Sequence, residues 1–227
     1  MVNRRIAGIY SGYDDLKAKG EIQYIFPPAL FSKNEGALLD CGGYIGDSVD
    51  RFVNILGNDL NKIYSFEALQ QNISALEKKK NEVSEKWNGE IIIVPFALAD
   101  KRKTIPFCEV EEGGGSFSPD FRCTARFKCA NPVNMFDVEA VKIDDIIKET
   151  ETIRYIKMDI EGAEYEALIG AEKTIKREKP GLAISIYHNA KDYYRLAELI
   201  LNYVPEYKLA VRHHKAKHVD TVLYAWI

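Results

Sequence analysis

The sequence lacks any long apolar run. Its longest apolar stretch, residues 91–99, is far shorter than the ~18 residues of a membrane-spanning helix, and Pro95 interrupts it. The first ten residues also lack the apolar segment of a secretory signal. We therefore expect a cytoplasmic protein without a membrane span.

An excess of charge of one sign is also absent. The 227 residues include 31 Lys and Arg against 34 Asp and Glu, which gives a formal net charge of −3. Nucleic-acid-binding proteins usually carry a clear basic excess, so we expect a small-molecule partner and no nucleic acid. A chain of this length and ordinary apolar content suits one α/β domain, while its oligomeric state stays open.

Cysteines are few, and their spacing is not that of a metal site. The four cysteines form no Cys-x-x-Cys pair, and no histidine lies close to them in the sequence. They are Cys41, Cys108, Cys123 and Cys129. In a protein without an export signal, this usage predicts reduced thiols and no cysteine-bound metal.

Short apolar runs alternate with amphipathic segments through most of the chain. The runs predict strands at residues 37–41, 63–66, 91–96, 155–158, 182–187, 208–213 and 221–227. Apolar residues spaced by three and four predict helices near 49–56, 70–80, 144–148, 163–179 and 193–203. Strands that alternate with helices predict a mostly parallel sheet covered on both faces, which is a three-layer α/β sandwich.

Two segments lack this alternation. Residues 101–142 contain the glycines 113–115 and no sustained helical period, so we expect an insertion of extended pairs and loops. The loop at 113–118 either covers an acceptor site or is a plain surface hairpin. Residues 1–36 are expected to pack as a lead-in segment on a domain that spans residues 37–227.

The strongest local motif is the turn DCGGYIG at residues 40–46. Asp40 ends the predicted strand, and the glycines allow positive φ and the close approach of a ligand before a helix begins. The spacing of Gly42, Gly43 and Gly46 is not the G-x-G-x-x-G of dinucleotide-binding proteins, which disfavours a nicotinamide-dependent oxidoreductase. The alternative is a tight turn that binds no ligand.

A second carboxylate follows the next predicted strand. Glu67 comes directly after residues 63–66, where a carboxylate can accept both hydroxyls of a ribose. Each such charge-assisted hydrogen bond contributes on the order of 1.5–3 kcal/mol. Taken alone, a glutamate at this place is more often a solvated loop residue, so its pairing with Asp40 carries the prediction.

Two more carboxylates and a histidine are expected at the same edge of the sheet. Asp159 and Glu161 follow the fourth predicted strand, and His188 follows the fifth. We expect these three residues to be catalytic without a bound metal, with Asp159 or His188 as the base. Alternatively, they bind a divalent cation, cap a helix or, for His188, are structural. Glu164 is expected to do little beyond favouring the helix dipole.

Together, these motifs resemble the FkbM-type methyltransferases, a family with the class I S-adenosylmethionine-dependent fold. The similarity covers residues 24–227 and is most specific in the segment KMDIEGAEYEALIGA. The other motifs that carry it are FPP at 26–28, DCGGYIGDS, SFEA, VPFALAD, VKIDDII and the KP after the long predicted helix. Tyr44 departs from the general class I pattern, which often has a glycine there, but larger residues are common in this family.

The resemblance implies S-adenosyl-L-methionine as cofactor and a Rossmann-like seven-stranded sheet in the order 3-2-1-4-5-7-6, with the seventh strand antiparallel. It implies that the turn borders the methionine portion, that Glu67 binds the ribose and that Ala97 and Leu98 border the adenine. Asp159 and Glu161 would line the methyl-transfer pocket. The full set implied to bind the cofactor is Asp40, Gly42, Gly43, Tyr44, Gly46, Glu67, Ala68, Ala97, Leu98 and Asp159.

The reaction implied by the resemblance is O-methylation of a hydroxyl on a sugar, glycan or natural product. Alignment of donor and acceptor can lower such a barrier by ~7–11 kcal/mol, and a base is expected because a protonated alcohol is a poor nucleophile. The alternative is a catalytically silent module that binds S-adenosylmethionine, since a fold and a cofactor pocket do not establish turnover.

Overall fold

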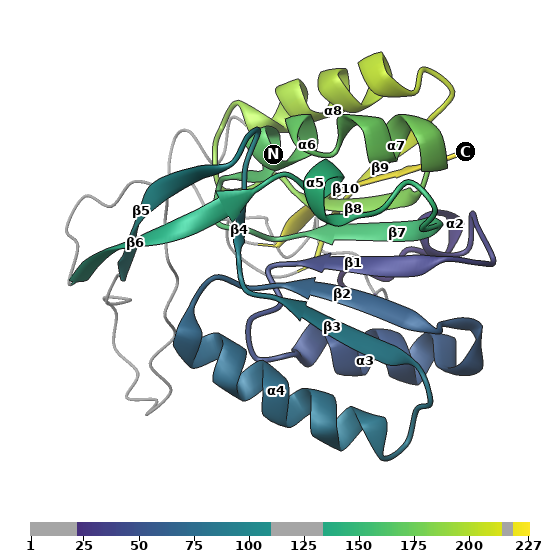
Figure 1. Cartoon of the computed structure of the whole chain (residues 1–227). Coiled ribbons are helices and arrows are strands. Elements are labelled where there is room, and N and C mark those ends of the chain that lie inside the picture. The colour runs from purple at the N-terminus through teal and green to yellow at the C-terminus, as the bar shows by residue number, and fades with distance from the viewer. Residues whose placement is uncertain (1–21, 110–133, 215–219) are drawn as a thin grey trace.

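The computed structural model describes residues 22–109, 134–214 and 220–227. Within them, a seven-stranded sheet has the order β3-β2-β1-β7-β8-β10-β9, as Figure 1 shows. The strands are β1 Ala37–Cys41, β2 Lys62–Phe66, β3 Glu90–Val94, β7 Ile153–Met158, β8 Gly181–Ser185, β9 Lys208–His213 and β10 Thr221–Trp226. Strand β10 is antiparallel to both of its neighbours, β8 and β9. The predicted fold class and strand order are therefore confirmed.

The centre of the sheet is buried on both faces. All five residues of β1 are buried, and β1 pairs in parallel with β2 on one side and β7 on the other. Leu38 packs against the helices of one face and Leu39 against those of the other, because successive side chains of a strand alternate. This two-sided burial explains why the run is apolar at every position except Asp40.

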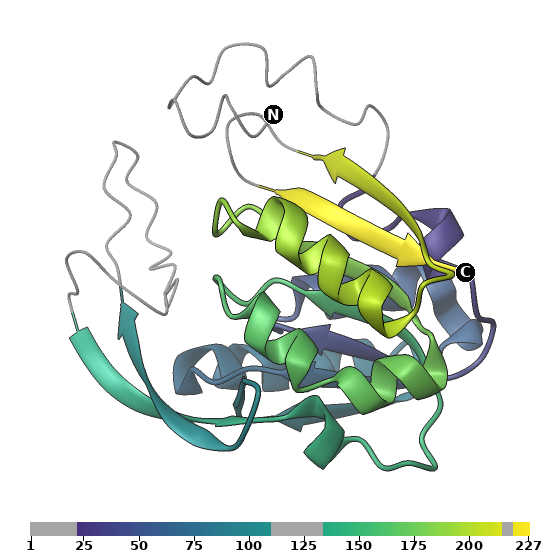
Figure 2. The ribbon, with the colours of Figure 1, turned by 90° about the horizontal axis from the view of Figure 1, so that it is seen from above.

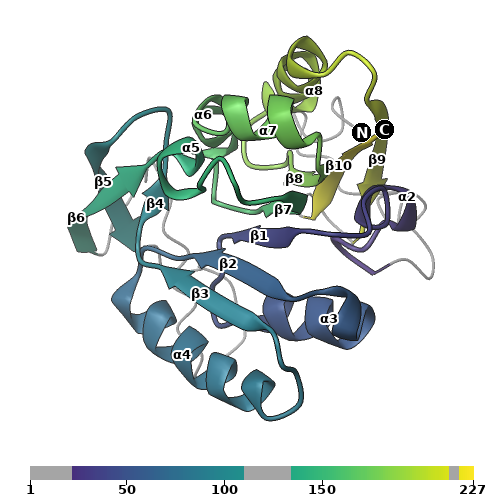
Figure 3. The same ribbon diagram turned by 45° about the vertical axis from the view of Figure 1, so that its right-hand side comes forward.

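Helices cover both faces of the sheet, as Figure 3 shows. One face carries α2 Pro27–Leu30, α3 Asp47–Leu56 and α4 Gln70–Ser84; the other carries α5 Ile143–Ile146, α6 Glu164–Ile169, α7 Glu172–Glu178 and α8 Asp192–Tyr203. In α3, the predicted apolar stripe of Val49, Phe52, Val53 and Leu56 is buried. No helix among the described residues combines the length and apolar character needed to cross a membrane.

One predicted helix is two helices in the structure. The single helix expected over 163–179 is divided into α6 and α7 around Gly170. A Cβ on Gly170 would lie 2.2 Å from the carbonyl oxygen of Ala99, so the chain passes directly against another backbone there. This contact between distant segments breaks the helix, and the helical spacing of apolar residues does not reveal it.

The insertion forms a second, smaller sheet. Strands β4 Ala97–Leu98, β5 Lys103–Glu109 and β6 Asn134–Val141 have the order β4-β6-β5, and β5 and β6 pair antiparallel. Figures 1 and 2 show this pair leaving the main sheet on the side where the parallel strands end. The extended pairing expected in 101–142 is present, whereas the loop at 113–118 lies outside the described residues.

The segment before β1 packs closely on the sheet. Tyr24, Ala29 and Leu30 are buried against the face that α3 and α4 cover. A Cβ on Gly181 would lie 1.8 Å from the carbonyl oxygen of Ala29, so α2 meets the start of β8 at backbone distance. This packing brings residues near position 24 to the centre of the molecule.

Candidate active site

The predicted site residues meet at the carboxyl ends of β1, β2 and β7. Strand β1 lies between β2 and β7, and the chain leaves β1 toward β2 on one side and later returns to β7 on the other. Ligands of open α/β sheets bind outside the strand ends at such a switch point. The turn after β1, Glu67 after β2 and Asp159 after β7 all border this place.

The glycine turn is packed tightly against its neighbours. Gly42 has φ +86°, and a Cβ on it would lie 2.1 Å from the carbonyl oxygen of Asp159. The N–H groups of Gly42 and Gly43 both donate to the carbonyl oxygen of Phe66, at 3.0 and 2.9 Å. Gly46, with φ +85°, then begins α3. Contacts within the protein therefore require glycine at position 42, whether or not a ligand binds there.

Asp40 lies inside the protein and not on the surface of the site. Its side chain is fully buried, and Oδ1 lies 3.0 Å from Nζ of Lys157 on β7. Its Oδ2 accepts a hydrogen bond of 2.7 Å from Oγ of Ser48. The structure thus brings Asp40 to the predicted edge of the sheet, but its side chain contacts Lys157, Ser48 and Ser65 inside the protein.

Lys157 was not among the predicted site residues. Its Nζ also donates to the carbonyl oxygen of Gly42 at 2.7 Å and lies 5.3 Å from the centre of the Tyr24 ring. Burial alone would lower the pKa of Lys157, but the negative charges of Asp40 and Asp159 raise it overall. The lysine is therefore a buried cation that joins Asp40 to the turn. A lysine near the end of the fully buried strand IRYIKM, one residue before Met158, is the signal that could have indicated it.

Glu67 connects the two loops that follow β1 and β2. Its Oε2 accepts a hydrogen bond from the N–H of Tyr44, and its Oε1 accepts one from the N–H of Leu69, both at 2.9 Å. Burial raises the pKa of Glu67, and these backbone hydrogen bonds oppose the rise. Tyr44 has φ +47°, so the turn bends toward the carboxylate in an uncommon conformation. The predicted ribose-binding residue and the turn are thus held together.

Ala97, predicted to border the adenine, meets Ala68, another of the predicted cofactor-binding residues. Ala68 and Ala97 are partly buried and pack against the same small apolar cluster between β4, β5 and β6. Leu98 is also in β4, but its side chain is buried in the main core and is not part of this cluster. The N–H of Glu67 donates to the carbonyl oxygen of Val94, which ties the end of β2 to the end of β3. These contacts provide an apolar surface next to the Glu67 carboxylate.

His188 lies among three carboxylates. Its Nδ1 is 2.9 Å from Oε1 of Glu164, and its Nε2 is 3.5 Å from Oδ1 of Asp159 and 3.5 Å from Oε2 of Glu161. Burial would lower the pKa of His188, but the carboxylates, Glu164 first, raise it to about 9. The predicted grouping of Asp159, Glu161 and His188 is therefore present.

The structure contradicts the minor role that was predicted for Glu164. Its side chain is fully buried, and its Oε1 accepts the N–H of Ile160 at 2.9 Å as well as facing His188. A surface residue that only favours a helix dipole would be solvated. Glu164 meets His188 because β7 and β8 are neighbours in the sheet, so the residues that follow these two strands lie close together.

Asp159 is held by two tyrosine hydroxyls. Tyr24 donates to Oδ2 at 2.7 Å and Tyr187 donates to Oδ1 at 3.1 Å. Burial would raise the pKa of Asp159, but His188, Lys157 and the Tyr24 hydrogen bond lower it overall, so the group is ionised. Tyr24 was not predicted, because it lies outside any regular element and reaches the site only through packing of the lead-in segment.

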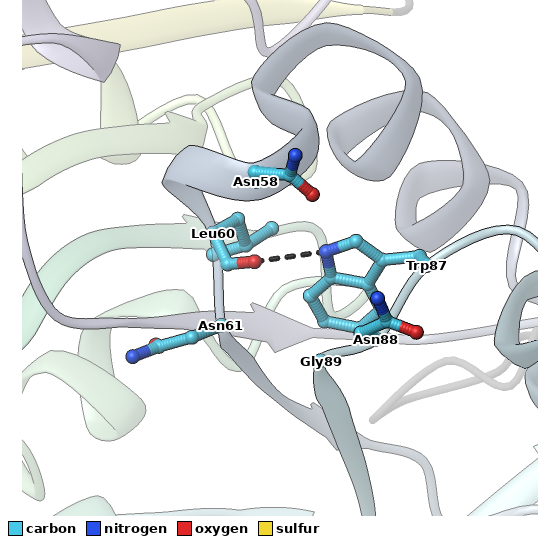
Figure 4. Close-up of a pocket in the computed structure, with 6 residues that line it drawn as sticks. All are labelled: Asn58, Leu60, Asn61, Trp87, Asn88 and Gly89. Atoms are coloured by element: carbon cyan, nitrogen blue, oxygen red, sulfur yellow. Dashed lines mark hydrogen bonds between the residues drawn. The ribbon is translucent and has the colours of Figure 1, made fainter.

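A pocket at the other end of the sheet is separate from this site. Figure 4 shows it around Trp87, whose Nε1 donates to the carbonyl oxygen of Leu60 at 2.8 Å. Its lining residues are Asn58, Leu60, Asn61, Trp87, Asn88 and Gly89. They precede β2 and β3, so the pocket is at the amino ends of the parallel strands, where such sheets do not bind their main ligands.

Comparison with solved structures identifies the fold. The crystal structure of methyltransferase FkbM from Methylobacillus flagellatus KT matches with a TM-score of 0.73 and 24% sequence identity, over 99% of this chain and 52% of that chain. The chain thus spans about half the length of that protein. A precorrin-6y C5,15-methyltransferase from Geobacter metallireducens GS-15 matches at 0.48 and 11% identity, over 92% of both chains. The fold is that of the class I methyltransferases.

The sequence comparison then gives the family. The model of the methyltransferase FkbM domain matches residues 40–209, and the chain belongs to this family. The match runs from Asp40 at the end of β1 to the start of β9, and it includes Glu67, Asp159 and His188. No protein among the curated sequences matches the chain significantly.

Proposed function

We propose that this protein transfers the methyl group of S-adenosyl-L-methionine to a hydroxyl oxygen of a sugar, glycan or natural product. The observation that carries the proposal is the position of Glu67 and Asp159. These carboxylates flank the glycine turn at the switch point of a methyltransferase fold. One is next to the apolar surface of Ala68 and Ala97, and the other is next to His188.

The residues present suit the cofactor. Glu67 is partly exposed, so its carboxylate can accept ribose hydroxyls, which would replace some of its present hydrogen bonds from the backbone and from Asn72. The apolar surface of Ala68 and Ala97 suits a flat adenine ring. The negative charge of Asp159 suits a sulfonium. When bound, S-adenosylmethionine supplies an electrophilic methyl group.

Asp40 has an indirect role in this proposal. Because its carboxylate is buried against Lys157 and Ser48, it does not reach a ligand by its side chain. Through Lys157 it holds the carbonyl oxygen of Gly42 in place, and so it positions the turn that would border the methionine portion. Gly43, Tyr44 and Gly46 belong to the same turn and would contact the cofactor through their backbone.

Asp159 is the group proposed to meet the acceptor hydroxyl. Its side chain is 24% exposed, whereas that of His188 is 7% exposed, so an acceptor reaches the carboxylate more easily. Asp159 would accept the hydrogen bond of the acceptor hydroxyl and orient its oxygen toward the methyl group. Tyr24 and Tyr187 fix this carboxylate in place, and such positioning supplies a large part of the rate enhancement in transfer reactions.

Calorimetric titration with S-adenosylmethionine and with its demethylated product tests the cofactor. The wild-type protein should bind both, and Glu67→Ala should weaken binding by roughly tenfold or more, because two hydrogen bonds to a charged group are lost. Glu67→Gln keeps the side chain's shape and should weaken binding less. The matched control is Glu90→Gln. The Glu90 side chain is 62% exposed and lies at the start of β3, at the end of the strand away from the site. Equal affinity in Glu67→Ala would remove Glu67 from the cofactor site.

The reaction itself is tested with isotopically labelled methyl donor. Incubation with sugars, glycans and natural-product extracts, followed by mass spectrometry, should show a labelled methyl group on an oxygen. Asp159→Asn should still bind the cofactor and lose turnover. Cofactor binding with no methylated product from any extract would instead support a silent binding module, and a methyl group on nitrogen or carbon would overturn the proposed O-methylation.

A further inference from the structure

The two nitrogens of His188 have different surroundings. Nδ1 faces Glu164, whose Oε1 lies at 2.9 Å and is itself held by the N–H of Ile160. Nε2 points between Asp159 and Glu161. Among the described residues, this nitrogen has no hydrogen-bond partner, although only 7% of the side chain is exposed. A nearly buried polar group is thus directed at two carboxylates.

This arrangement has the features of a metal-binding histidine. Such histidines commonly donate one ring N–H to a carboxylate, which fixes the tautomer and leaves the other nitrogen as ligand. Glu164 occupies the position of that carboxylate. The side chains of Asp159, Glu164 and His188 offer ligand atoms that all lie within 4.8 Å of one another.

The distances also fit a cation. Ligands bound at roughly 2.0–2.2 Å from one metal ion lie about 3–3.5 Å from each other. Nε2 of His188 is 3.5 Å from Oδ1 of Asp159 and 3.5 Å from Oε2 of Glu161. Nε2 of His188 therefore lies at ligand spacing from one oxygen of each of these two carboxylates.

We propose that His188 Nε2, Asp159 Oδ1 and Glu161 Oε2 bind one divalent transition cation, with Glu164 as the residue that orients His188. One imidazole and two carboxylates suit Mn²⁺ or Zn²⁺ better than Mg²⁺, which prefers oxygen ligands alone. The Asp159 and Glu161 side chains are 24% and 27% exposed, so the remaining coordination positions face solvent. A site open on one side can accept an oxygen of a second molecule.

The proposal that the site binds a cation does not depend on the proposed function. A catalytic role for the cation does rest on that function. If an acceptor hydroxyl meets Asp159, it also meets the open side of the metal. A bound cation lowers the pKa of a coordinated hydroxyl, which makes the oxygen a better nucleophile.

Titration of the chelator-treated full chain with MnCl₂ tests the site without any substrate. Calorimetry and the loss of the electron paramagnetic resonance signal of free Mn²⁺ should show one saturable site, with MgCl₂ binding more weakly. His188→Ala should remove saturable binding, and Glu164→Gln should weaken it by roughly 10–100-fold, as expected for a residue that orients a ligand. Glu161→Gln, at a partly exposed position that tolerates change, should also weaken binding. Glu90→Gln should bind as the wild type does.

Two outcomes would overturn the metal site. One is the absence of saturable Mn²⁺ and Zn²⁺ binding by folded wild-type protein, and the other is unchanged binding in Glu161→Gln and His188→Ala. Thermal melting in chelator checks that each variant is folded. Calorimetry with S-adenosylmethionine on the same metal-free samples separates the two proposals: cofactor binding without metal binding rejects the cation alone, and metal binding without cofactor binding rejects the proposed function alone.

Discussion

Lys157 and Asp40 form a buried ion pair across two adjacent parallel strands. Their charged atoms are 3.0 Å apart, and the side chains are 4% and 0% exposed. The two residues are also direct partners in the register of β7 and β1. The pair therefore lies at the point where the two halves of the sheet meet, directly beneath the glycine turn.

Removal of Lys157 should destabilise the protein strongly. In Lys157→Met, Asp40 remains buried without its cation, and the loss of one partner of a buried ion pair typically costs about 3–5 kcal/mol. Denaturant unfolding measures the change. The double variant Lys157→Met with Asp40→Asn should recover part of the loss, because no buried charge is left alone. A Lys157→Met protein as stable as the wild type would contradict this account of the pair.

Tyr24→Phe should affect the site through Asp159. The variant loses the 2.7 Å hydrogen bond to Oδ2, and hydrogen bonds to charged groups contribute about 1.5–3 kcal/mol to stability. If Asp159 orients the acceptor, kcat should also fall while the affinity for S-adenosylmethionine changes little. Tyr64→Phe is the matched control, since its hydroxyl donates to Glu151 at 3.0 Å at the other end of β2. Equal kcat losses in both variants would show that Tyr24 acts only on stability.

Gly42→Ala should disrupt the turn. The added methyl group would lie 2.1 Å from the carbonyl oxygen of Asp159, so either the turn or the end of β7 must move. We expect reduced stability together with a loss of S-adenosylmethionine binding. Gly57 also has positive φ, but a Cβ there would meet nothing within 4 Å. Gly57→Ala should therefore cost only backbone strain of about 1–3 kcal/mol and keep binding. Similar binding losses in both variants would refute the role of the contact with Asp159.

Glu178 should contribute to the dependence of stability on pH. Burial would raise its pKa, but hydrogen bonds from Arg177, Lys33 and the N–H of Ile153 lower it overall. A carboxyl group with a lowered pKa in the folded state adds stability above its unfolded pKa, and this contribution is lost as pH falls through the folded pKa. Melting curves of wild type and Glu178→Gln should differ most at neutral pH and converge in acid. A difference in melting temperature that stays constant as the pH falls into the acid range would contradict the lowered pKa of Glu178 in the folded state.

Much of the fold follows from the sequence because its signals are local. Five buried residues in β1 appear as an apolar run, and the stripe of α3 appears as helical spacing. The strand order came from family resemblance, since periodicity does not determine which strands are neighbours. The break at Gly170 was not predictable in this way, because it depends on contact with Ala99, far away in the chain.

The candidate site could likewise be predicted from the sequence only in part. Glu67, Asp159 and His188 were predictable because each follows a strand, and strand ends gather at one edge. The function of Glu164 was not, because it requires knowing that β7 and β8 are adjacent. Tyr24 was missed for a related reason: no pattern around it indicates that its ring reaches the switch point.

The contact between Tyr24 and Asp159 has a practical consequence for any shortened version of this protein. A fragment that starts at β1 would retain every strand of the main sheet, its helices other than α2 and the whole family match. It would nevertheless lack the hydroxyl that anchors the carboxylate and the ring that shields the buried ammonium of Lys157. Such a fragment would lack part of the support of its own candidate site, and an assay performed on it would understate the proposed activity.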